Sequence, residues 1–117
     1  MKSKVKLIDK PWGHEEILEH NENYTVKRLL MKHNHCCSLQ MHTKKHETIY
    51  VLSGVLEIAC GDSICDLKTI ILRANDYYVI KNKKVHRMYA ILDCIYLEAS
   101  TSQLDDVVRL ADNYGRI

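Results

Sequence analysis

Four polar side chains in this sequence have the types and the spacing that suit a metal ion. Gln40 and His42 are two residues apart, so on a β-strand they point to the same face. Glu47 follows across a short polar turn, from which a returning strand can bring its carboxylate to the same place. An amide oxygen, an imidazole and a carboxylate make three ligands for a divalent cation, and His86 is a fourth candidate further along the chain.

The stretch that holds the first three of these residues, 38–54, predicts two short strands joined by a tight turn. We expect the strands to pair as a hairpin, with Gln40, His42 and Glu47 facing one way. His46 lies in the turn and is expected to be solvated, with an exchange of roles with His42 as the alternative. A single histidine on a strand is more often structural, so the interpretation depends on the four residues together.

The rest of the chain predicts an all-β domain. The 117 residues are 46% hydrophobic and 27% charged, which is typical of one globular domain spanning 1–117. Turn signals recur about every ten residues, as in Asn21-Glu22-Asn23 and Gly61-Asp62-Ser63, between short segments rich in valine, isoleucine, leucine and tyrosine. This pattern favours a β-sandwich or barrel.

The C-terminal segment has a different pattern. Leu104, Val107, Val108 and Ala111 follow helical spacing, and Ser102 with Asp105 resembles a capping box. We therefore expect one short helix after the barrel.

Charge and composition exclude several classes of partner. Seventeen basic and fifteen acidic residues leave a net charge of +2, which gives no basis for nucleic-acid or membrane binding. The first ten residues lack the apolar core of a signal peptide, and no apolar run approaches the ~20 residues of a membrane span. The expected location is the cytoplasm, and the five cysteines, an odd number, are expected to be free thiols.

The spacing of the candidate ligands resembles the first motif of the cupin family. That motif reads glycine, five residues, His-x-His, three or four residues, glutamate, six residues, glycine. Here Asn34 stands at the first glycine, Gln40 at the first histidine, and His42, Glu47 and Gly54 at the later positions. The resemblance implies a double-stranded β-helix, or jelly-roll barrel, with a metal site.

The second cupin motif is less complete in this chain. His86 stands at its histidine, Asn75 at its first glycine, and Lys81-Asn82-Lys83 at its Pro-x-Gly. Ala90 stands where that motif has asparagine.

A closer resemblance covers almost the whole chain. It is carried by Pro11-Trp12-Gly13, Tyr24-Thr-Val-Lys-Arg28, Ser38-Leu-Gln-Met-His42, Val51-Leu-Ser-Gly54 and Asp105-Asp-Val-Val-Arg109…Asp112-Asn-Tyr-Gly-Arg116. These segments are similar to the type II mannose-6-phosphate isomerase family, in which this cupin is often the C-terminal half of a protein with mannose-1-phosphate guanylyltransferase activity. Type I isomerases also hold zinc with a Gln-x-His pair, glutamate and histidine, which supports Gln40 as a ligand.

This resemblance implies interconversion of mannose 6-phosphate and fructose 6-phosphate through an enediolate. Zinc is the expected metal, with manganese, iron, cobalt and nickel as alternatives, because the donor set does not choose among them. Lys27 or a hydroxide held by the metal would be the base. Lys27, Arg28 and Arg116 are the candidates to bind the phosphate.

Two other functions stay open at the level of sequence. One is a non-catalytic cupin that binds a sugar or another small ligand, and the other is a metal-dependent oxygenase, against which Gln40 counts. Since the apolar segments are numerous for a lone small barrel, we also expect a homodimer.

Overall fold

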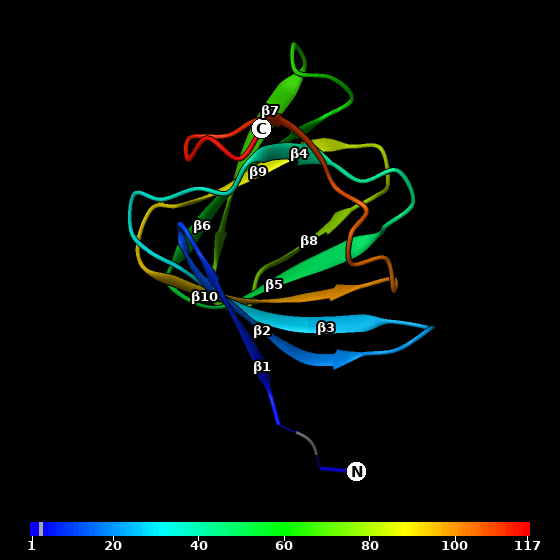
Figure 1. Ribbon diagram of the computed structural model, residues 1–117. Helices are drawn as coiled ribbons and strands as arrows, with labels where there is room; N and C mark the ends of the chain where they lie inside the picture. The colour runs from blue at the N-terminus through cyan, green and yellow to red at the C-terminus, as the bar shows by residue number, and fades with distance from the viewer. Residues whose placement is uncertain (3) are drawn as a thin grey trace.

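Alternation of buried and exposed residues builds two antiparallel sheets in the computed structural model, which describes residues 1–2 and 4–117 (Figure 1). The first sheet has the order β1-β2-β3-β10-β5-β8 and the second the order β11-β4-β9-β6-β7. The strands are β1 (Lys6–Lys10), β2 (Gly13–His20), β3 (Thr25–Met31), β4 (Leu39–Met41), β5 (Glu47–Ser53), β6 (Val55–Gly61), β7 (Leu67–Arg73), β8 (Tyr77–Ile80), β9 (Val85–Ala90), β10 (Cys94–Ser100) and β11 (Val108–Ala111).

The core lies between the two sheets. Along β3 every second residue, from Thr25 to Met31, is buried, so one face of the strand points inward and the other outward. The apolar residues Ile49 of β5 and Ile58 of β6 come from opposite sheets, and both are fully buried in one cluster. The predicted all-β barrel is therefore confirmed.

The hairpin predicted within residues 38–54 is wrong. β4 pairs with β9 and β11 in the second sheet, whereas β5 pairs with β10 and β8 in the first. The turn between them therefore crosses from one sheet to the other. Gln40 and Glu47 both lie near His86, but they reach it from different sheets.

The predicted C-terminal helix is also wrong. Residues 102–107 form no regular element, and β11 adds to the edge of β4, with Val108 opposite Met41 and Arg109 opposite Gln40. A three-residue strand such as β4 has an unpaired edge that a valine-rich segment can complete. In Figure 1 this segment, orange to red, passes from the end of β10 to the sheet that contains β4. Within the described residues there is no helix long and apolar enough to cross a membrane.

Among the residues that the structure describes, three turns hold a residue other than glycine in the left-handed region. Asn34, Asn75 and Lys83 have φ of 62°, 75° and 68°, and they stand at glycine positions of the two motifs that the sequence resembles. Asparagine visits this region readily, whereas a lysine there carries a penalty of about 1–2 kcal/mol from its Cβ. The fold thus keeps the backbone shape of these turns although the glycines are gone.

We predict that Lys83→Gly raises the free energy of unfolding by about 0.5–1 kcal/mol. Glycine removes the left-handed penalty and loses part of that gain through its greater entropy in the unfolded chain. The hydrogen bond from the backbone N–H of Lys83 to the His42 carbonyl, 2.6 Å long, is kept. Urea denaturation measures the change.

Lys81→Gly is the matched control. Lys81 is an exposed lysine in the same turn without a positive φ, so the same substitution is expected to lower stability there. Equal losses in the two variants would contradict the strain at Lys83.

Candidate metal centre

His42 lies one residue beyond β4 and is buried at 4% exposure. Its Nδ1 is 2.6 Å from the backbone carbonyl oxygen of Asp106. A carbonyl can only accept, so Nδ1 carries the proton and donates it. In the neutral ring the lone pair is then on Nε2, at the far side of the ring, where it can bind a cation.

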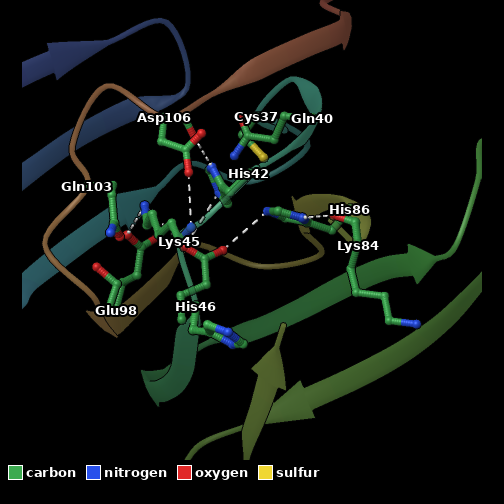
Figure 2. A network of polar contacts seen from close by, with 12 residues as sticks. Cys37, Gln40, His42, Lys45, His46, Lys84, His86, Glu98, Gln103 and Asp106 are labelled. Atoms are coloured by element: carbon green, nitrogen blue, oxygen red, sulfur yellow. Dashed lines mark hydrogen bonds and ion pairs between the residues drawn. The ribbon is translucent and has the colours of Figure 1, made fainter. Parts of the chain in front are cut away.

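His86 on β9 has the same arrangement. The ring is fully buried, and its Nδ1 donates to the Lys84 carbonyl oxygen at 3.0 Å, a contact drawn as a dashed line in Figure 2. Its Nε2 lies 3.2 Å from Oε1 of Glu47, while Nε2 of His42 lies 3.7 Å from Oε2 of the same carboxylate. The ring centroids of the two histidines are 5.1 Å apart.

These three side chains form a donor cluster that fits a divalent cation. The Nε2 atoms of His42 and His86 and both oxygens of Glu47 are buried, and none makes a hydrogen bond of standard geometry. One donor atom from each residue lies within 4.8 Å of the others. Leaving a buried polar group unpaired costs about 1–3 kcal/mol, and two histidines with a glutamate are a known ligand set of zinc. An ion at the centre would satisfy all three.

Gln40, the fourth predicted ligand, lies beside this cluster. It is opposite His86 in the register of β4 and β9, so the two side chains share the inner face of the sheet. Its Oε1 accepts a hydrogen bond of 2.7 Å from Ser38 Oγ, which leaves a second lone pair on that oxygen. The exposed His46 is outside the cluster, so the structure favours His42 over it.

Lys45 is the residue that sequence reasoning missed. It belongs to the short polar turn before Glu47, yet its side chain is buried. Its Nζ lies 3.2 Å from Oε2 of Glu47 and 3.0 Å from Oε2 of Glu98. The one signal in the sequence is its spacing of two from Glu47, which places both side chains on one side of an extended chain.

Lys45 belongs to a buried chain of alternating charges. Lys27, the predicted base, lies 3.4 Å from Glu15 and 4.0 Å from Glu98, and Lys45 links Glu98 to Glu47. Burial, reinforced by the charge of Glu47, raises the pKa of Glu98 although both lysines oppose this. Burial would also raise the pKa of Glu47, but the two imidazoles and Lys45 outweigh it and hold that pKa well below its usual range.

The two arginines predicted to bind phosphate are in different places. Arg28 points out of the barrel, where it is exposed and paired with Glu16. Arg116 lines the interior cavity, but its guanidinium makes two hydrogen bonds to Asp112, of 2.7 and 2.9 Å. Arg116 therefore lies at the cavity, but its charge is already compensated by Asp112. Arg28 lies away from the cavity.

A cavity of about 430 Å³ opens beside the donor cluster. Its wall includes Gln40, His42 and Lys45 from the metal side, Lys27 from β3 and Glu98 from β10. Pockets for small ligands commonly have volumes of about 300–1,000 Å³. The cavity is therefore large enough for a small polar molecule next to the candidate metal centre.

Asp106 holds the turn between β4 and β5 in place. Its carboxylate accepts hydrogen bonds from the backbone N–H groups of Thr43, Lys44 and Lys45, at 3.1, 2.7 and 3.0 Å, and its backbone carbonyl orients His42 (Figure 2). The three N–H groups, that of Lys44 first, lower the pKa of this carboxyl, so it accepts as a carboxylate at neutral pH. The C-terminal segment thus positions a candidate ligand.

The two-sheet barrel and the inward-facing histidine–glutamate cluster are those of a cupin. The sequence matches the mannose-6-phosphate isomerase C-terminal family over residues 2–112, and the chain belongs to that family.

Its relatives include biosynthetic enzymes. The chain is 33% identical to the xanthan biosynthesis protein XanB of Xanthomonas campestris pv. campestris, over 95% of this chain and 24% of that protein. It is 34% identical to the alginate biosynthesis protein AlgA of Pseudomonas aeruginosa (93% and 23%) and 31% identical to the mannose-1-phosphate guanylyltransferase of Escherichia coli K12 (94% and 23%). The chain therefore spans about a quarter of the length of these relatives.

Solved structures share the fold at low sequence identity. KdgF from Halomonas superposes with a TM-score of 0.74 at 16% identity, covering 86% of this chain and 91% of that one. Oxalate decarboxylase of Bacillus subtilis, described with Mn(II) centres, superposes with a TM-score of 0.78 at 17% identity, covering 90% and 30%. These likenesses establish the fold alone.

Asp106→Ala is predicted to weaken zinc binding by about 10- to 100-fold. Three backbone donors lose their acceptor and the turn loosens. The Asp106 carbonyl that orients His42 remains, but it is no longer held in a fixed position against the turn. Competition with a chromogenic chelator measures the affinity, and circular dichroism checks the fold. Asp105→Ala is the control, because it removes the exposed carboxylate of the neighbouring residue. This variant should bind zinc with unchanged affinity. Equal affinity in all three proteins would show that the turn does not position the ligand.

Proposed function

We propose that this protein is a metal-dependent sugar-phosphate isomerase that interconverts mannose 6-phosphate and fructose 6-phosphate. The observation that carries the proposal is the buried cluster of His42, Glu47 and His86, whose ligand atoms converge within 4.8 Å of one another beside a cavity of a size suited to a small ligand. Membership in the mannose-6-phosphate isomerase C-terminal family supports the choice of substrate.

In this proposal His42, Glu47 and His86 hold the ion, with Gln40 as a fourth ligand. The ion, when bound, supplies a Lewis acid for the carbonyl and hydroxyl oxygens of the sugar. Zinc is the metal that this set suggests first, and manganese is an alternative supported by the Mn(II) centres described for oxalate decarboxylase.

The chemistry that remains is the movement of a proton between two neighbouring carbons through an enediolate. Lys27 and Glu98 stand together in the cavity wall, 4.0 Å apart. In this ion pair the carboxylate can accept a proton from carbon, and the ammonium can donate a hydrogen bond to a developing oxyanion. Lys27 therefore acts with Glu98 rather than as a free amine.

A second candidate function is a non-catalytic cupin that binds a sugar or another small ligand. It is favoured by Lys45, whose ammonium lies 3.2 Å from Oε2 of Glu47, one of the candidate metal ligands. A fixed positive charge there weakens the binding of a cation. The two functions differ in turnover and in metal content.

The isomerase proposal predicts that the zinc-loaded chain converts mannose 6-phosphate to fructose 6-phosphate. NMR spectroscopy of the two sugar phosphates measures the rate of this conversion. His86→Ala removes a candidate metal ligand. It should reduce the rate at least about 100-fold and should also lower the amount of bound zinc. His46→Ala, which changes an exposed histidine next to Glu47, is the matched control and should keep both. Ligand-dependent thermal stabilisation without turnover would favour the binding function instead.

We further propose that the protein is a cytoplasmic homodimer. Exposed apolar side chains occur on the edge strands of both sheets, with Ile71 on β7 and Tyr77 and Val79 on β8. Covering such residues removes apolar area and an open strand edge from water. Light scattering coupled to size exclusion is expected to show twice the chain mass, and a species of 13.6 kDa would contradict the dimer.

A further inference from the structure

The cavity beside the donor cluster has more positive than negative side chains in its wall. Six described lining residues are cationic and three are acidic, namely Glu15, Glu98 and Asp105. The cations are Lys6, Lys10, Lys27, Lys45, Arg109 and Arg116. An excess of positive charge in a concave site raises the local concentration of anions. The cavity is therefore suited to an anionic ligand.

Half of these cations are already held by carboxylates. Lys27 and Lys45 share Glu98, and each has a second glutamate within 3.4 Å. Arg116 is bound in two places by Asp112. A ligand anion would have to compete with these protein carboxylates, so none of the three is the natural place for it.

Arg109 differs from them. Its Nε is buried and has no hydrogen-bond partner, and within the part of the chain that the structure describes no carboxylate forms an ion pair with its guanidinium. A buried donor on a charged group that lacks a partner costs more than a neutral one. The Nε–H of Arg109 thus lacks an acceptor, and the half-buried side chain belongs to the wall of a ligand-sized cavity.

The strand register aims Arg109 toward the same cavity as the candidate ligands. Arg109 of β11 is opposite Gln40 of β4, and Gln40 is opposite His86 of β9, so the three side chains leave the same face of the sheet. Neighbouring strands are about 4.8 Å apart, which places Arg109 and His86 roughly 10 Å apart along the sheet. A six-carbon chain with a terminal phosphate can bridge this span.

We propose that Arg109 anchors an anion-binding subsite that takes the phosphate monoester of the substrate. Its planar fork of donors matches two phosphate oxygens, and Lys6 and Lys10 on β1 add positive charge at the rim. This assignment replaces Arg28, which is outside the barrel, and Arg116, which is compensated by Asp112. The choice of a sugar phosphate rests on the proposed isomerase function, but phosphate binding itself does not require turnover.

Calorimetric titration of the chelator-treated full chain tests the subsite, because without metal a phosphate has no ion to bind. The probes are mannose 6-phosphate, inorganic phosphate and unphosphorylated mannose. Arg109→Gln should weaken the binding of mannose 6-phosphate and of inorganic phosphate by about 10- to 100-fold, because a charge-assisted hydrogen-bonded pair is lost. It should leave the binding of mannose unchanged. Arg109→Lys should recover part of the affinity, since it keeps the charge but loses the fork.

Arg87→Gln is the matched control. Arg87 also has a buried Nε without a partner, but it is outside the cavity wall and its guanidinium donates to the Ala111 carbonyl oxygen at 3.3 Å. This variant should bind both phosphate probes like the original protein. Equal weakening in Arg87→Gln and Arg109→Gln would show a general structural effect and overturn the subsite.

Two other outcomes also overturn it. In the first, Arg109→Gln binds phosphate as tightly as the original chain, whereas Arg116→Gln binds it more weakly. In the second, the original chain does not bind phosphate at all. A protein that binds phosphate through Arg109 but does not isomerise the sugar would retain the subsite while the reaction fails. Binding and turnover are thus separate readouts of the two proposals.

Discussion

The carboxylate of Glu47 is the constraint around which the structure is arranged. It is a charge at 2% exposure, and a buried charge is tolerated only when partners of opposite sign or hydrogen-bond donors surround it. β5 of one sheet carries this carboxylate, β9 of the other sheet brings His86 beside it, and the turn beyond β4 brings His42 and Lys45. The ammonium of Lys45, 3.2 Å from Oε2 of Glu47, is the opposite charge. The two sheets meet at this point for an electrostatic reason as well as an apolar one.

The features that sequence could reveal are those encoded over short distances. The spacing of Gln40 and His42 specifies a shared face, and alternating burial specifies strands, so the ligand types and the all-β class follow. The partner of each strand does not follow, because alternation assigns a face and not a neighbour. For that reason the turn before Glu47 was expected to close a hairpin, whereas it crosses between sheets.

The C-terminal segment also shows that a local sequence pattern does not specify which strand will be its neighbour. A few apolar residues at helical spacing also fit a chain that lies across the barrel and contributes Leu104 and Val107 to a cavity wall. The decisive influence was the open edge of β4, which is a property of the assembled sheet. Lys45 was missed for a related reason, since a lysine is buried only when distant carboxylates such as Glu98 are brought to it.

The ammonium of Lys45 gives the barrel an internal counter-ion. Small metal-dependent domains often stay unfolded until the ion arrives, because their ligands repel one another or remain unpaired without it. Here Glu47 has a covalently tethered cation 3.2 Å away, and Asp106 fixes the turn through backbone bonds that involve no metal. The fold therefore has its own compensation for the buried charge of Glu47, and Lys45 shares its ammonium between Glu47 and Glu98.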